Sequence, residues 1–229
     1  MTYGGGPTAT HALAGVDLDL GVEALAVMGP SGSGKTTLLH CLAGIVPPTS
    51  GSVTWRGRDL TGLSDARRTV LRRSDFGFVF QSGQLLPELP AVENVALPLM
   101  LAGVDRRTAT ARAAGWLDHL GLGGLEQRRP GELSGGQGQR VAIARALVAT
   151  PGVVFADEPT GALDAATSAE VMGVLVGATW TAGAALVVVT HDEDVARWCG
   201  RVLTMGDGRL VAERSYRPAS AAFPGGGAR

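Results

Sequence analysis

The chain has 229 residues, of which 45% are hydrophobic and 18% are charged. This composition excludes an intrinsically disordered protein, and the length suits one domain with a subdomain. The formal net charge of −1 gives no electrostatic field that would attract nucleic acid, so we expect no nucleic-acid partner.

No run of eighteen apolar residues occurs, and the N-terminus lacks the charged-then-apolar pattern of a signal peptide. The two cysteines, Cys41 and Cys199, have neither metal-ligand spacing nor the pattern of a disulfide framework. We therefore expect a cytosolic chain that does not itself span a membrane.

The first third of the sequence predicts short strands and two helices. Apolar alternation or short apolar runs indicate strands at 13–20, 23–29, 53–55 and 76–81. The helical patterns follow a glycine-rich loop or a polar turn and cover 35–45 and 63–73. Strands that alternate with helices in this way predict an α/β fold with a mainly parallel sheet.

Residues 82–132 differ in character from their surroundings. They contain two helical patterns, prolines at positions 87, 90 and 98, and no convincing strand. We interpret this span as a helical subdomain inserted into the α/β core.

The remaining sequence returns to alternating elements. Helices are predicted at 134–149 and 164–180, buried strands at 152–157 and 185–190, and an antiparallel hairpin with its turn at 206–208. We expect one domain over residues 1–217 and a disordered tail over 218–229.

Residues 29–36 match the phosphate-binding pattern G-x-x-x-x-G-K-[ST] between a predicted strand and a predicted helix. In such a P-loop, glycines let backbone N–H groups point at phosphate oxygens, and the positive end of the following helix adds to the attraction. Lys35 can reach the β- and γ-phosphates, and Thr36 can offer its hydroxyl to Mg²⁺. The residues expected to bind ATP here are Gly29, Pro30, Ser31, Gly32, Ser33, Gly34, Lys35, Thr36 and Thr37.

Lys35 is the only lysine in the sequence, and every other basic residue is arginine. A compact ammonium on a thin stem fits inside a loop whose N–H groups already surround the phosphates, whereas a planar guanidinium would collide with that loop. At position 35, the shape of the side chain therefore favours lysine over arginine.

A second helix start with exposed N–H groups is predicted after Ser134, which stands at an N-cap position before two glycines. Here the sequence resembles the nucleotide-binding domain of ABC (ATP-binding cassette) proteins, whose LSGGQ signature matches Leu133–Gln137. The family's other hallmarks follow in order and cover nearly the whole chain: the Q-loop at 78–81, the Walker B strand at 153–159, the D-loop at 161–164 and the switch histidine at 188–192. The resemblance implies a P-loop NTPase core.

The expected catalytic residues are Glu158, His191, Gln81 and Lys35. Asp157 ends an apolar run and can hold Mg²⁺, while Glu158 beside it would act as general base toward water. The resemblance implies that His191 contacts the γ-phosphate and Glu158, and that Gln81 joins Thr36 and Asp157 as a ligand of Mg²⁺, the expected cofactor.

In ABC proteins the signature of one copy caps the ATP held by the P-loop of another. The resemblance therefore implies a head-to-tail homodimer, or a pair with another cassette, around two ATP molecules. The residues expected to act in trans are Ser134, Gly135, Gly136, Gln137 and Asp164. Hydrolysis would reopen the dimer and pass the motion to an integral membrane permease, which places this ATPase at the cytoplasmic face of the plasma membrane.

Residues 72–104 resemble the bacterial branch that serves macrolide exporters, lipoprotein-release complexes and peptide-resistance systems, especially in the ENVALPL portion. Partners in that branch are permeases with four membrane helices, so export or mechanical work across the membrane is expected. The transported substrate is a property of the permease.

Two positions depart from the family pattern. The aromatic residue that stacks on adenine usually follows a full strand, yet Tyr3 stands three residues from the start, which predicts weak stacking or a start internal to a longer reading frame. Gly138 replaces a usual glutamine, and glycine in a helix costs about 1 kcal/mol relative to alanine.

Three other functions compete with a transport ATPase. A DNA-repair or chromosome-organising ATPase would need a coiled-coil insertion, for which residues 82–132 leave no room. A translation-associated factor would need two cassettes in one chain. A regulatory cassette that binds ATP with little hydrolysis is the third, although every expected catalytic residue is in place.

Overall fold

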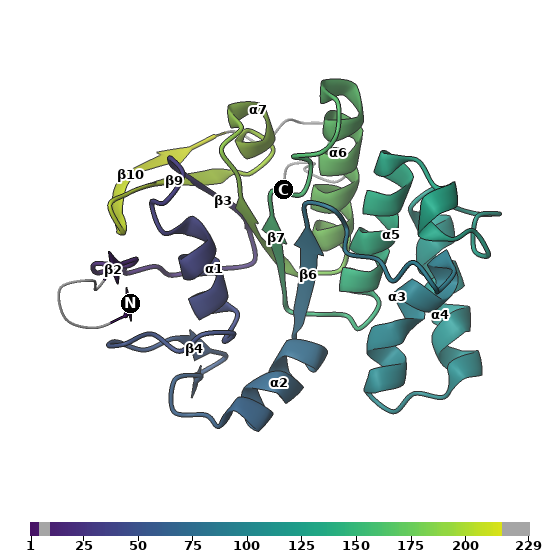
Figure 1. Ribbon diagram of the computed structural model, residues 1–229, viewed down its shortest axis with the longest axis horizontal. Helices are drawn as coiled ribbons and strands as arrows, with labels where there is room; N and C mark the ends of the chain where they lie inside the picture. The colour runs from purple at the N-terminus through teal and green to yellow at the C-terminus, as the bar shows by residue number, and fades with distance from the viewer. Residues whose placement is uncertain (5–9, 217–229) are drawn as a thin grey trace, which may run out of the picture.

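The computed structural model describes residues 1–4 and 10–216, so the predicted tail at 218–229 lies outside the described residues. A six-stranded sheet in the order β10-β9-β3-β8-β7-β6 forms the centre of the molecule (Figure 1). Its strands are β3 (Ala24–Met28), β6 (Phe76–Phe80), β7 (Val153–Asp157), β8 (Ala185–Val189), β9 (Arg201–Gly206) and β10 (Arg209–Ser215).

Neighbouring strands from β9 to β6 run parallel, whereas β10 pairs antiparallel with β9. The chain returns from β9 to β10 through Asp207 and Gly208, whose φ values of 47° and 73° fit a type I′ turn. The predicted hairpin and the mainly parallel α/β sheet are confirmed.

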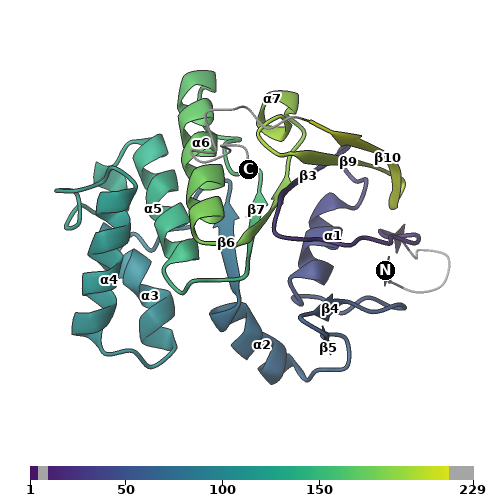
Figure 2. The same ribbon diagram turned by 180° about the vertical axis from the view of Figure 1, so that it is seen from behind.

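Helices cover both faces of this sheet because alternate residues of each strand point to opposite sides. Leu25 and Val27 of β3 face a core with α1 (Lys35–Leu42) and α2 (Asp65–Ser74). Ala26 faces a second core, built with α5 (Gly135–Leu147) and α6 (Ala165–Thr181). The short α7 (Glu193–Ala196) precedes β9. Figures 1 and 2 show the two helical layers from opposite sides.

The span 82–132 is helical, as the sequence predicts. It holds α3 (Ala91–Leu101), α4 (Arg106–His119) and the 3₁₀ helix η2 (Pro130–Glu132), and it contains no strand. These helices pack beside α5 at one end of the molecule (Figure 2). The boundaries of a separate subdomain remain a prediction.

The strands predicted at 13–20 are absent from the described structure, although the burial pattern behind them is present. Val16, Leu18 and Leu20 are half-buried and alternate with exposed Asp17 and Asp19. Alternation reports which side chains are covered, but a strand also needs a hydrogen-bonded neighbour. Among the described residues, backbone bonds near this segment are confined to Leu13 and Ala14, so 15–20 belongs to no ladder.

Two short antiparallel pairs flank the P-loop side of the sheet. One joins β1 (Thr2–Tyr3) to β2 (Thr10–His11), and the other joins β4 (Thr54–Trp55) to β5 (Arg58–Asp59). Among the helices of residues 1–4 and 10–216, none is both long enough and apolar enough to cross a membrane.

Glycines 136 and 138 of α5 differ in their surroundings, which generates a stability prediction. A Cβ at Gly138 would meet no atom within 4 Å. Because alanine favours helix over glycine by about 1 kcal/mol, Gly138→Ala is expected to raise the melting temperature by about 2–4 °C. Gly136→Ala should lower it, since its Cβ would lie 2.6 Å from Cγ2 of Thr167. Thermal unfolding of both variants checks this, and an unchanged or lower value for Gly138→Ala would contradict it.

Candidate active site

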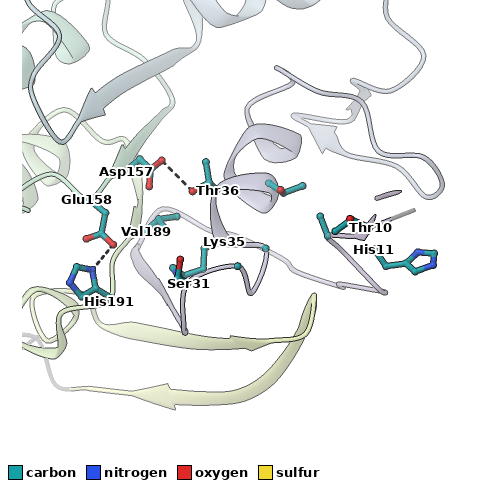
Figure 3. A pocket seen from close by; sticks show the side chains of 13 residues that line it. Thr10, His11, Ser31, Lys35, Thr36, Asp157, Glu158, Val189 and His191 are labelled. Atoms are coloured by element: carbon teal, nitrogen blue, oxygen red, sulfur yellow. Dashed lines mark hydrogen bonds and ion pairs between the residues drawn. The ribbon is translucent and has the colours of Figure 1, made fainter. Parts of the chain in front are cut away.

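A cavity of about 640 Å³ lies where β3, β7 and β8 end, at the carboxyl edge of the parallel sheet. Ligands bind at this edge in open α/β sheets because the loops that follow the strands converge there. Figure 3 shows the lining side chains, which come from four separate stretches of sequence. The lining residues are Thr10, His11, Ala12, Ser31, Gly32, Gly34, Lys35, Thr36, Thr37, Asp157, Glu158, Val189 and His191.

The P-loop connects β3 to α1 and owes its path to glycine at two crowded positions. Gly29 has φ 144°, and a Cβ there would lie 2.3 Å from the carbonyl oxygen of Met205. Gly34 has φ 99°, and its Cβ would lie 2.2 Å from the carbonyl oxygen of Ala12. No side chain fits at either place, so the loop presses against β9 and the segment after β2. The backbone N–H groups at the start of α1 are left facing the cavity side.

Lys35 bends back over this loop. Its Nζ donates hydrogen bonds to the carbonyl oxygens of Gly29 at 2.7 Å and Pro30 at 2.8 Å. The ammonium therefore lies within the loop and beside the cavity, where a phosphate could replace these carbonyl acceptors. Two close carbonyl partners leave little width for a guanidinium, which agrees with the shape argument from the sequence.

Asp157 and Thr36 bring oxygen atoms together across the cavity. The Thr36 hydroxyl donates to Asp157 Oδ2 at 3.4 Å (Figure 3). Burial raises the pKa of Asp157, and the negative charge of Glu158 raises it further. A bound cation would relieve both effects, because it favours the ionised carboxylate. Carboxylate and hydroxyl oxygens are ligands that suit Mg²⁺.

Glu158 is held at both carboxylate oxygens by the loop that follows β8. His191 Nδ1 lies 2.8 Å from Oε1, and the Thr190 hydroxyl donates to Oε2 at 3.1 Å. The hydrogen bond to Glu158 raises the pKa of His191, and the charge of the carboxylate adds to the effect. The carboxylate thus has a fixed direction while the imidazole, 74% exposed, faces solvent.

Several predicted site residues do not line this cavity. Gln81 is exposed and its side chain lies near Gly161, and Tyr3 is 42% exposed. Gly29, Pro30 and Ser33 belong to the loop but not to the lining. Residues 133–137 and Asp164 are also outside it.

The signature turn and the start of α6 form one packed surface. Ser134 caps α5 by accepting from the Gln137 N–H at 3.3 Å, while Gln137 Oε1 accepts from the Ser134 N–H at 2.9 Å. Asp164 caps α6 through the Thr167 N–H at 3.0 Å, and this bond lowers the pKa of Asp164. Gly136 packs directly against Thr167, so the two helix starts keep a fixed relation.

Sequence reasoning missed Thr190 and the lining residues Thr10, His11, Ala12 and Val189. Thr10 lines the cavity because the pairing of β1 with β2 carries it there, and no local motif marks it. Thr190 stands inside the switch segment, but its contact with Glu158 becomes visible only in three dimensions.

The family model described as ABC transporter matches residues 14–161 of the chain. The chain belongs to the ABC transporter family. Its P-loop, Walker B strand and the whole of α5 lie within the matched range, and the switch histidine comes shortly after β8, the next strand along the chain. The predicted family, ATPase activity and P-loop fold are confirmed for this ABC cassette.

Named relatives of the cassette come from the predicted bacterial branch. The lipoprotein-releasing system ATP-binding protein LolD of Geobacter metallireducens is 48% identical over 92% of this chain and 94% of its own length. The macrolide export ATP-binding/permease protein MacB 1/2 of Paracoccus denitrificans is 46% identical over 98% of this chain but 34% of its own length. The cassette is the ATP-hydrolysing subunit of a bacterial ABC transporter.

Solved structures agree with this placement. A dimeric structure of the ATP-binding cassette MJ0796 in a post-hydrolysis state, bound to ADP and Pi, has a TM-score of 0.84 and 39% identity. The superposition covers 95% of this cassette and 96% of that chain.

The contact between His191 and Glu158 predicts how the imidazole titrates. In an NMR titration, His191 of the cassette should titrate above the ordinary histidine value of about 6.5. The ion pair is present below that pKa and is lost as pH rises through it. Glu158→Gln should bring the midpoint down, with the signals of His119, at the end of α4, as internal control. An unchanged midpoint in the variant would contradict the prediction.

Proposed function

We propose that this cassette works as one half of a head-to-tail dimer that encloses two ATP molecules and drives a separate membrane permease. The observation that carries the proposal is the placement of Lys35, Asp157, Glu158 and His191 around one cavity at the end of the parallel sheet. These groups supply phosphate binding, metal binding and a general base within one site.

Glu158 is the proposed general base. Its carboxylate accepts the proton of the attacking water, and His191 holds Oε1. The exposed imidazole is proposed to contact the γ-phosphate. Lys35 and the N–H groups of the P-loop hold the β- and γ-phosphates and stabilise the charge that develops on them. The catalytic roles are those expected from the sequence, and the contacts between Glu158 and the switch loop support them.

Thr36 and Asp157 are proposed to hold Mg²⁺, with Gln81 completing the set. The Thr36–Asp157 contact shows that two suitable oxygen donors already converge. Gln81 directly follows Phe80, which is the register partner of Asp157 across β6 and β7, so its backbone lies at the same sheet edge. When bound, Mg²⁺ would neutralise charge on the β- and γ-phosphates.

Tyr3 remains the proposed adenine-stacking residue. It pairs with Thr10 in the β1–β2 ladder, and directly opposed residues of an antiparallel pair project to the same face. Thr10 lines the cavity, and its pairing with Tyr3 supports this proposal. Ser31, Gly32, Gly34 and Thr37 line the phosphate end.

The surface proposed to act in trans comprises Ser134, Gly135, Gly136, Gln137 and Asp164. Ser134 and Gly135 are exposed, and Gly136 packs on α6 beside Asp164. Ser134, Gly135 and Asp164 are thus open to solvent and outside the lining of the chain's own cavity, as a cap on a second copy needs. The dimeric MJ0796 cassette supports this arrangement.

Replacing the base tests the dimer mechanism. Glu158→Gln should lower the ATP turnover number by about 10²–10⁴-fold, the usual contribution of a general base, and should leave an ATP-bound dimer in gel filtration. A double variant that adds Ser134→Glu should stay monomeric, because its carboxylate would repel the γ-phosphate in trans. A strictly monomeric Glu158→Gln cassette in the presence of ATP would overturn the mechanism.

The permease partner is proposed from the relatives' names. This cassette corresponds to a third of an ATP-binding/permease protein and to nearly all of an ATP-binding protein of a lipoprotein-releasing system. We therefore assign it to export or mechanical work across the membrane, as a peripheral subunit at the cytoplasmic face of the plasma membrane, where ATP is available.

A groove of about 590 Å³ between α2, β6, α3 and α5 is the proposed permease contact. Phe78, Phe80 and Leu101 give it an apolar floor, and Arg72, Arg73 and Arg145 give it basic groups. An amphipathic permease segment with an acidic residue would match this combination.

Arg145 links the groove to the loop that carries Gln81. Its guanidinium donates to the carbonyl oxygens of Gly83 at 2.6 Å and Gln84 at 2.8 Å. Gln139, one turn and a half earlier in α5, donates to the Phe80 carbonyl at 2.9 Å. A permease segment in the groove would therefore press on the residues that fix the Gln81 loop, which supports the proposed transfer of motion.

Leu101 and Val22 offer a matched test of the groove, because each is 61% exposed and Val22 lies outside it. In cells of the source organism, Leu101→Glu should lower the share of the cassette that sediments with membranes by about tenfold, as expected for an interface hot spot. Val22→Glu should sediment as the unmodified cassette does. Normal sedimentation of Leu101→Glu would exclude the groove as the contact.

A further inference from the structure

We propose that Thr190 is a positioning residue for ATP hydrolysis, whose hydroxyl fixes Oε2 of Glu158 in the direction needed to accept a proton from water. The inference rests on the proposed role of Glu158 as general base. It adds a residue that touches neither phosphate nor metal and acts through the carboxylate.

The hydrogen bonds around Thr190 direct its hydroxyl proton toward Glu158. The residue directly follows β8 and is 1% exposed, and its own N–H donates to the Val27 carbonyl at 3.1 Å. Its Oγ1 accepts from the Asp192 N–H at 3.1 Å. The hydroxyl proton is then directed to Glu158 Oε2, also at 3.1 Å, since a buried hydroxyl needs an acceptor.

The two groups that hold Glu158 differ in how firmly they are themselves fixed. The His191 side chain is 74% exposed, whereas Thr190 is buried and anchored to β3 and to the turn before α7. The backbone of Glu158 is fixed as well, with its N–H bonded to the Val189 carbonyl at 2.9 Å. The bond from Thr190 is therefore the restraint that persists when His191 turns toward a phosphate.

A fixed carboxylate matters because the rate of general-base catalysis depends on geometry. Misplacement of a catalytic group by a small distance lowers the rate by large factors, while binding of the substrate need not change. Loss of the Thr190 hydroxyl should thus lower the turnover number and leave the Michaelis constant for ATP nearly unchanged. A purely structural role would instead change stability and spare the rate of the folded protein.

Thr190→Val removes the hydroxyl and keeps the shape of the side chain. We expect its turnover number for ATP to fall about tenfold, with the Michaelis constant within about twofold of the unmodified protein. Thr190→Ser should restore most of the rate because it returns the donor. Thr190→Ala removes the hydroxyl by a second route, and all rates are measured at a temperature where circular dichroism shows each variant folded.

Thr179 supplies the matched control. It is also buried, at 2% exposure, and its hydroxyl donates to the carbonyl oxygens of Leu175 and Val176 within α6, away from the cavity. Thr179→Val should keep the normal turnover number. If Thr190→Val and Thr190→Ala both turn over ATP at the normal rate when folded, or if Thr190→Ser is as slow as Thr190→Val, the proposal is wrong.

A double-variant cycle separates this inference from the role of Glu158. In the Glu158→Gln background, Thr190→Val should cause no further loss, because the carboxylate through which it acts is gone. An additional tenfold loss there would overturn the proposal. Normal hydrolysis by Glu158→Gln alone would instead refute the general-base role, whereas an inactive Glu158→Gln beside a normal Thr190→Val would refute this inference alone.

Discussion

The parallel pairing of β3, β8, β7 and β6 is the constraint on which the site depends. In a parallel ladder the strands end at the same edge, so loops far apart in sequence become neighbours. The register pairs Val27 with Val189, Asp157 with Val189 and Phe80 with Asp157. A shift of any strand by one residue would turn its side chains to the other face and separate the P-loop from Glu158 and the switch loop.

Most of the fold could be predicted from sequence because buried parallel strands leave a strong local signal. The apolar runs before Gly29, Asp157 and Thr190 mark three strand ends, and the glycine pattern marks the loop between β3 and α1. The segment 15–20 shows where this reasoning fails. Its alternating pattern correctly predicted which side chains are half-buried. A strand also needs a hydrogen-bonded neighbour, and a local sequence pattern does not show whether the fold supplies one.

Sequence motifs predicted the residues with chemical roles at the site. They did not predict the residues that strand pairing or a single hydrogen bond brings there. Lys35, Thr36, Asp157, Glu158 and His191 do meet at the cavity. Thr10 lies at the cavity because β1 pairs with β2, and Thr190 contacts Glu158 through one hydrogen bond of its hydroxyl. Neither contact can be recognised from the order of residues in the sequence. Gln81, by contrast, carries a motif and yet is absent from the cavity lining; its side chain lies near Gly161, and the loop that follows it is tied to α5 by Gln139 and Arg145.

Helix α5 is consequently more than a cover for the sheet. Its first turn packs on α6 beneath the exposed signature residues, and two later side chains hold the Gln81 loop. Burial lowers the pKa of Arg145, yet a guanidinium stays charged even so, and its two carbonyl acceptors compensate the lost hydration. A rotation of α5 would therefore displace the proposed dimer contact, the Gln81 loop and the groove together.

Several groups at or next to the cavity lower the stability of the folded chain. Asp157 is a desolvated acid beside another acid, Glu158 adopts a left-handed φ of 47°, and the buried Ser33 hydroxyl has no hydrogen-bond partner among the described residues. Nucleotide that binds the folded chain and not the unfolded one shifts this balance by mass action. Bound nucleotide is thus expected to stabilise the folded subunit and so to slow its proteolysis.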